Sequence, residues 1–233
     1  MITIRRSEER GHADHGWLDA HHTFSFADYF DPDFVQFGTL RVINQDRVKP
    51  GKGFPTHGHR DMEIVTYVLD GLLEHRDSMG NGSQIRPGEV QYMSAGRGVT
   101  HSEFNASATD ELHLLQMWVL PRKSGGEPRY DQKDFPEAER RGKLRLVVSP
   151  DGRDGSITIG QDAELRVGTL DAGDRVRQSI PADRVAWLHV AKGRVKLDGE
   201  ELGPGDGAGI RDAATIELEG VEHADVVLWT LTE

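Results

Sequence analysis

The stretch EIVTYVLDGLLEHR, residues 63 to 76, contains two short apolar runs separated by Asp70-Gly71. β-Branched and aromatic residues dominate the first run, which is typical of extended structure. An Asp-Gly pair supplies the backbone angles that a tight chain reversal needs. The stretch therefore predicts two short β-strands, at residues 63–69 and 72–76, joined by a turn.

The same alternation of runs and turns continues on both sides of this stretch. Extended runs occupy residues 38–48, 90–94 and 112–120, and turn residues lie at Gly80-Asn81-Gly82 and Pro87-Gly88. Helical periodicity is nearly absent from this part of the chain. We therefore predict that the first half of the protein is an antiparallel all-β structure.

The second half repeats this pattern after a polar connection at residues 121–142. Its segment LHVAKG, residues 188–193, corresponds to YVLDG, residues 67–71, and Pro204-Gly205-Asp206 corresponds to Pro87-Gly88-Glu89. A diverged internal repeat is the economical interpretation. The sequence thus predicts an all-β fold of two tandem antiparallel, jelly-roll-like β-barrels.

The polar connection also marks the expected domain boundary. It is rich in glycine, proline and charged residues, as connections between domains commonly are. The chain has 233 residues, which is long enough for two modest cores. We expect one barrel in residues 1–130 and a second in residues 131–233.

Composition excludes several classes of function. The chain has 39 acidic and 28 basic residues and a formal charge of −11, which disfavours direct binding to nucleic acid or to an anionic membrane. It has no cysteine, so disulfides, thiolate metal sites and cysteine nucleophiles are excluded. No stretch has the length and apolarity of a signal peptide or membrane span, and we expect a cytoplasmic protein.

Two pairs of side chains have the spacing of metal ligands. His57 and His59 are two residues apart, so both side chains leave the same face of an extended strand. His101 and Glu103 repeat that spacing in a second strand. Surface histidines in a loop would explain one such pair, but the second pair argues against this. The pattern predicts one divalent transition metal ion with nitrogen and oxygen ligands, and ligand type alone does not name the metal.

Two sets of residues resemble the motifs of the cupin superfamily. The first motif is matched by Gly51, His57, His59, Glu63 and Gly71, and the second by Gly88, Gly96, His101 and Asn105. Longer segments resemble one cupin family, the pirins: GHADHGWL at residues 11–18, HTFSF at 22–26, and SAGRG at 94–98 before His101-Ser102-Glu103.

The resemblance implies a metal site and its ligands. Pirins consist of two cupin barrels, and the N-terminal barrel binds a metal through three histidines and a glutamate. The matching residues here are His57, His59, His101 and Glu103. We therefore expect a metal-binding cupin domain followed by a cupin domain without a metal. Fe(II) is the expected ion, with Cu, Ni, Mn, Zn and Co as alternatives.

The resemblance also implies an activity. Several bacterial pirins oxidise the flavonol quercetin by 2,3-dioxygenation, which opens the heterocycle and releases carbon monoxide. We therefore expect an oxidoreductase whose partners are a flavonol-type substrate and dioxygen, with Glu103 as both ligand and catalytic base. The alternatives are a metal-dependent regulatory pirin that binds a partner protein without turnover, and a sugar-isomerase or storage-type cupin.

Two further expectations concern the surroundings of the metal. Glu63 lies four residues after His59 and has the same parity, so in a regular strand it would face the ligands. A supporting role and direct ligation both remain open for it. The walls of the substrate pocket should be apolar and aromatic, and the candidates are Phe26, Tyr67, Met93 and Met117.

Overall fold

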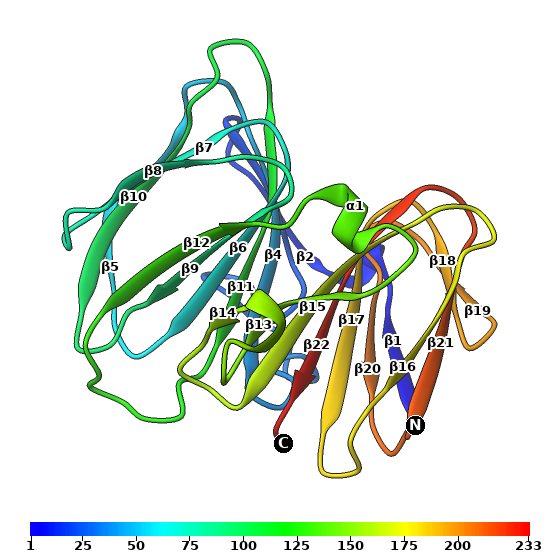
Figure 1. Cartoon of the computed structure of the whole chain (residues 1–233). Helices are drawn as coiled ribbons and strands as arrows, with labels where there is room; N and C mark the ends of the chain where they lie inside the picture. The colour runs from blue at the N-terminus through cyan, green and yellow to red at the C-terminus, as the bar shows by residue number, and fades with distance from the viewer.

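The computed structural model describes residues 1–233 and consists almost entirely of β-strands, arranged as two barrels side by side (Figure 1). Strand pairing is antiparallel except between β13 and β14. The predicted all-β fold of two antiparallel barrels is thereby confirmed. Three single-turn helices complete the structure: η1 (Ser7–Glu9), α1 (Glu137–Arg140) and η2 (Arg153–Gly155). None of them has the length or apolarity to cross a membrane.

The first barrel is built from a seven-stranded and a four-stranded sheet. The larger sheet has the spatial order β12 (Arg129–Asp134), β9 (Glu89–Ser94), β6 (Glu63–Asp70), β11 (Leu112–Val119), β4 (Leu40–Val48), β3 (Leu18–His22) and β2 (Gly11–Asp14). The smaller sheet has the order β5 (Gly53–His59), β10 (Val99–Asn105), β7 (Leu73–Asp77) and β8 (Gly82–Ile85).

The second barrel has the same division into seven and four strands. Its larger sheet has the order β1 (Ile2–Arg5), β20 (Gly207–Ile210), β17 (Val185–Lys192), β22 (Ala224–Leu231), β15 (Ala163–Leu170), β13 (Arg145–Ser149) and β14 (Ile157–Thr158). Its smaller sheet has the order β16 (Arg175–Ser179), β21 (Thr215–Gly220), β18 (Val195–Leu197) and β19 (Glu200–Leu202).

The turn at Gly71 carries the chain from one sheet of the first barrel to the other. The predicted strands on either side are present as β6 and β7, but β6 pairs with β9 and β11 whereas β7 pairs with β8 and β10. Gly71 has a φ of 84°, and a Cβ there would lie 2.6 Å from the carbonyl oxygen of Glu111. A side chain is therefore excluded by both the backbone conformation and the close approach.

A shared hydrophobic core joins the two barrels. It contains 26 buried residues from both larger sheets, including Leu115, Met117, Trp187 and Trp229. The indole N–H of Trp229 donates to Sδ of Met117 at 3.2 Å, so the two sheets are in direct contact. Strands β4, β6 and β11 consequently bury both faces, one inside the first barrel and one against the second.

The chain crosses between the barrels near its N-terminus. Strand β1 pairs with β20 of the second barrel, with Ile2 opposite Ile210, whereas β2 belongs to the first barrel. Strand β12 pairs with β9, so residues 129–134 belong to the first barrel. The division into residues 1–130 and 131–233 stays a proposal, and strand pairing places β1 and the end of β12 across it.

Replacing Trp229 by alanine is expected to destabilise the whole protein. The indole is fully buried between the barrels, and removing it leaves a large cavity. The free energy of unfolding should fall by about 3–5 kcal/mol, measured by denaturant titration. Replacing Phe30, whose side chain is 72% exposed, should change it by less than about 0.5 kcal/mol. Equal small losses in both variants would contradict a shared core.

Candidate metal centre

Strands β5 and β10 bring three histidines together. The two strands pair in antiparallel register with His101 directly opposite His57, and His59 lies two residues further along β5 on the same face. The Nε2 atom of His101 lies 2.9 Å from Nε2 of His59 and 3.1 Å from Nε2 of His57. The structure thus places the three predicted histidines around one point.

These distances fit a common metal ion. Two imidazole nitrogens bound at about 2.1 Å and at right angles to each other are about 3.0 Å apart, whereas tetrahedral ligands would be about 3.4 Å apart. The measured separations of 2.9 and 3.1 Å correspond to right angles. His101 and each of the other two histidines therefore match adjacent positions of an octahedral site, which leaves positions for a carboxylate, water or substrate.

The protonation of the histidines also suits a cation. Burial and the neighbouring imidazoles lower the pKa of His59 to about 4 and the pKa of His101 to about 3. Both rings are therefore neutral at pH 7. The Nδ1 atom of His57 lies 2.8 Å from the carbonyl oxygen of Pro55 and donates to it, which leaves the lone pair on Nε2. Nitrogen lone pairs that converge in this way require a cation or a shared proton.

Glu103 adds a buried carboxylate beside His101. A register shift between His101 and Glu103 interrupts the pairing of β10 with β5, while the pairing of β10 with β7 stays regular. The amide of Gln116 donates to Oε2 of Glu103 at 2.7 Å, and the amide of Gln91 lies 3.5 Å from Oε1. Burial raises the pKa of Glu103 to about 7. The carboxyl group is therefore fixed in position and poised to exchange a proton near neutral pH.

A cavity of about 400 Å³ opens onto this cluster. His57, His59 and Glu103 line it together with aromatic side chains, and the ring centroids of Trp118 and His59 are 4.9 Å apart. Phe26 packs edge-on against Trp118 at 5.4 Å. This volume and the apolar wall are those of a site for a small organic molecule.

The chain's relatives were identified by comparison with known proteins. Residues 3–119 match the model of the family named Pirin, and residues 146–231 match the quercetinase C-terminal cupin domain. The chain belongs to the pirin family. The resemblance stated from the sequence is thereby confirmed.

Proteins of Escherichia coli are similar to this pirin along its whole length. It is 48% identical over 231 residues to the quercetin 2,3-dioxygenase of strain K12, covering 99% of both chains. The crystal structure of YhhW matches with a TM-score of 0.95 and 48% identity, over 99% of this chain and 97% of that one. The structure of the bacterial pirin YhhW in complex with nickel(II) matches with a TM-score of 0.94 and 47% identity, over 100% and 99%.

The expected pocket walls of this pirin were only partly right. Phe26 lines the cavity, as predicted. Tyr67, Met93 and Met117 do not: Tyr67 and Met117 lie in the core between the barrels, and Met93 packs in a separate cluster with Ile64. Because both faces of these strands are buried, apolar character did not reveal which face each side chain takes. Trp118, next to Met117, points to the cavity instead.

Glu63 lies away from the histidine cluster. Its carboxylate accepts hydrogen bonds from the hydroxyl of Tyr92, the hydroxyl of Ser94 at 2.9 Å and the backbone N–H of Gly160 at 3.2 Å. The strand does not stay regular after His59, because β5 ends there and the chain turns before β6 begins at Glu63. Glu63 therefore links the two barrels, which is a structural role.

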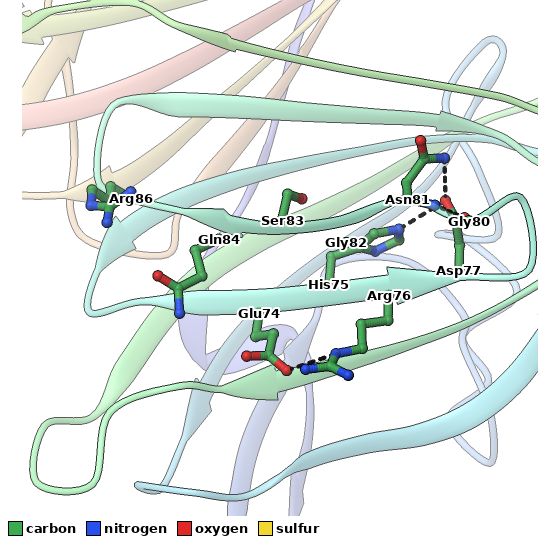
Figure 2. A pocket seen from close by; sticks show the side chains of 10 residues that line it. All are labelled: Glu74, His75, Arg76, Asp77, Gly80, Asn81, Gly82, Ser83, Gln84 and Arg86. Atoms are coloured by element: carbon green, nitrogen blue, oxygen red, sulfur yellow. Dashed lines mark hydrogen bonds and ion pairs between the residues drawn. The ribbon is translucent and has the colours of Figure 1, made fainter.

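His75 is a neighbour of the site that the sequence did not assign to it. It lies opposite Glu103 on β7 and is fully buried, and Nδ1 lies 3.4 Å from the amide of Gln91. Its Nε2 lies 3.2 Å from Oδ2 of Asp77, which Asn81 also contacts at 2.8 Å (Figure 2). The sequence offered one signal, the spacing of two residues between His75 and Asp77, which puts both side chains on the same face of a strand. Only the pairing of β7 with β10 shows that this face lies beside the site.

Asp46 is a second buried carboxyl group on the cavity wall. It projects from β4 into the cavity that Glu103 also lines. Burial, and then the charge of Glu103, raise the pKa of Asp46 to about 7. Nothing in its sequence neighbourhood distinguishes it from an exposed strand residue, so sequence reasoning missed it.

Proposed function

We propose that this pirin is a metal-dependent dioxygenase that opens the heterocyclic ring of flavonols such as quercetin. The observation that carries the proposal is the convergence of three imidazoles and a buried carboxylate beside a cavity of about 400 Å³ with aromatic side chains in its lining. The name of the relative from Escherichia coli, quercetin 2,3-dioxygenase, supports the choice of substrate.

His57, His59 and His101 would hold the metal, and Glu103 would be the fourth ligand. Fe(II) is the proposed ion, and nickel is the first alternative because a related pirin structure contains it. When bound, the ion would act as a Lewis acid with free positions for ligands that the protein does not supply. The role of the second barrel would be structural, through the core that it shares with the first.

Glu103 would act as the base for the substrate. A flavonol carries a hydroxyl group next to its ring carbonyl, and the O–H bond breaks as the proton passes to a carboxylate oxygen of Glu103. Burial raises the pKa of Glu103, and a bound cation would favour its ionised form, so the carboxylate would be available to take up this proton. Gln116 and Gln91 orient the carboxylate through their amide groups.

The aromatic wall would bind and orient the flat rings of the flavonol. Trp118, Phe26 and Phe54 line the cavity together with Leu18 and Ala20. Their burial of the substrate would also exclude water from the reacting atoms. The overall reaction adds both atoms of dioxygen, opens the ring to an ester and releases carbon monoxide.

Aerobic turnover of quercetin by protein of known metal content is the test. We expect loss of the flavonol absorbance and release of carbon monoxide, both in proportion to bound metal, after separate loading with Fe(II) and Ni(II). Stoichiometric metal without any loss of flavonol would contradict the dioxygenase. That outcome would favour the alternative, a metal-dependent regulator that binds a partner protein.

A further inference from the structure

A second pocket lies where the two barrels meet, on the opposite face of β4 and β11 from the metal centre. Its volume is about 330 Å³, and residues of β3, β4, β11, β17 and the segment after β1 contribute to it. Three cationic side chains line it, those of Arg10, Arg47 and Lys192, together with the imidazoles of His21 and His113. No carboxylate lines it. Lys192 pairs with Asp70 and Arg47 with Glu111, so among these three cations only Arg10 has no direct ion pair.

Arg10 is a buried cation without a direct ion pair, and the charges of Asp206 and Asp46 act on it only from a distance. Arg10 is only 8% exposed, yet its guanidinium forms no ion pair. Its contacts are two long ones to neutral oxygens, 3.4 Å to Oε1 of Gln45 and 3.3 Å to Oγ of Ser7, and its Nε has no partner. Burial lowers the pKa of Arg10 to about 10, in accordance with this environment.

The other fully buried arginine of this segment shows the contrast. Arg5 pairs with Asp31 at 2.8 Å and donates to the hydroxyl of Tyr29 at 2.6 Å and to the carbonyl oxygen of Glu9 at 2.9 Å. A guanidinium has five N–H donors, and a buried one is costly unless an anion and hydrogen bonds compensate it. Arg5 has an ion pair and two further hydrogen bonds within the protein, and only its Nε lacks a partner. Arg10 has no such ion pair.

Gln45, whose side chain contacts Arg10, is held in place by other hydrogen-bond partners. The amide nitrogen of Gln45 donates to Nε2 of His113 at 2.9 Å and to the carbonyl oxygen of Ala191 at 3.0 Å. Its oxygen already accepts from His189 at 3.1 Å, so the side chain is held in one orientation. The free donors of Arg10 therefore remain available to a ligand.

The backbone at Gly205 closes the wall beside the guanidinium. A Cβ at this position would lie 2.6 Å from Nη2 of Arg10 and 2.3 Å from Oγ of Ser7, and the φ of Gly205 is 87°. Only glycine allows this approach. The guanidinium is thus enclosed by backbone on one side and open to the pocket.

We propose that this pocket binds a compact oxyanion, a phosphate or carboxylate group, which pairs with Arg10. A planar guanidinium binds either group through two parallel hydrogen bonds. Lys192 and Arg47 stand at the rim, where they also contact Asp70 and Glu111 at 2.7 and 2.9 Å. They would attract the anion and contact it from the side of the solvent. The site is separate from the metal centre and does not depend on the proposed reaction.

Isothermal titration calorimetry with inorganic phosphate, and in a second arm with malonate, tests the proposal on the metal-loaded protein. We expect one site per chain and an affinity that falls as salt is raised. Tighter phosphate binding would indicate a phosphorylated ligand, and tighter malonate binding a carboxylate. The His101→Ala variant should bind equally well, which excludes binding of the anion to the metal.

Substitutions identify the residues that hold the anion. Arg10→Gln should weaken binding by roughly tenfold to a hundredfold, Lys192→Gln by a few fold, and the exposed control Lys143→Gln not at all. Absence of saturable binding to the wild type would overturn the proposal, as would unchanged affinity in folded Arg10→Gln. If that variant does not fold, unchanged affinity in Lys192→Gln would overturn it.

Discussion

Replacing His101 by alanine is expected to abolish metal binding and turnover together. Its Nε2 is the atom that lies 2.9 and 3.1 Å from the corresponding atoms of His59 and His57, and it is the proposed ligand that shares a strand with Glu103. Without it, the two remaining histidines and the carboxylate no longer share a centre. Metal content after dialysis should fall to background, and quercetin turnover by at least about a hundredfold.

A matched histidine outside the cluster provides the control. His223 is exposed, contacts Asp171 at 2.8 Å and lies in the second barrel. His223→Ala should retain both metal and turnover. Full metal stoichiometry in His101→Ala, measured by elemental analysis, would show that other residues hold the ion.

Replacing Glu103 by glutamine is expected to separate metal binding from catalysis. The amide has the size of the carboxyl group and can still accept a hydrogen bond from Gln116, now 2.7 Å from Oε2. It cannot take up the proton of the flavonol hydroxyl. We expect most of the metal to be retained through the three histidines and kcat to fall by roughly 10²–10⁴-fold.

The control for this variant is a carboxylate in the neighbouring strand. Glu74 on β7 lies opposite Phe104 and contacts Arg76 at 3.0 Å near the surface. Glu74→Gln should leave kcat and KM unchanged. If Glu103→Gln keeps its turnover while metal content also stays high, the base role is wrong. If metal and turnover are lost in parallel, Glu103 acts chiefly as a ligand.

The histidine cluster could be predicted from the sequence because strand parity and the resemblance to pirins point to the same residues. His57 and His59 belong to one regular strand, and His101 lies directly opposite His57 in the next. Alternation of side chains then leaves a single arrangement. The strands themselves were predictable for a similar reason, since apolar runs and glycine turns alternate along most of the chain.

The cavity walls and the environments of Glu63 and Arg10 could not be predicted, because they depend on how the sheets of the two barrels pack against each other. Strands β6 and β11 are apolar on both faces, so Tyr67 and Met117 carry no signal that distinguishes the cavity from the interface between the barrels. The condition under which Glu63 would face the ligands, a regular strand, is not met because the chain turns after His59, and its contacts are structural. In the sequence, Arg10 is indistinguishable from an exposed charged residue. Its burial appears only in the folded structure, where residues of the second barrel lie beside it.

The position of β1 has a consequence for the order in which the protein can fold during synthesis. Residues 2–5 leave the ribosome well before their partners, which are residues 207–210. The β2–β12 region can pair within itself long before then, whereas the N-terminal strand waits, unpaired, for nearly the whole chain to be made. Strand β1 therefore pairs late although it is synthesised before its partner, and its pairing requires that the second barrel has formed as far as β20.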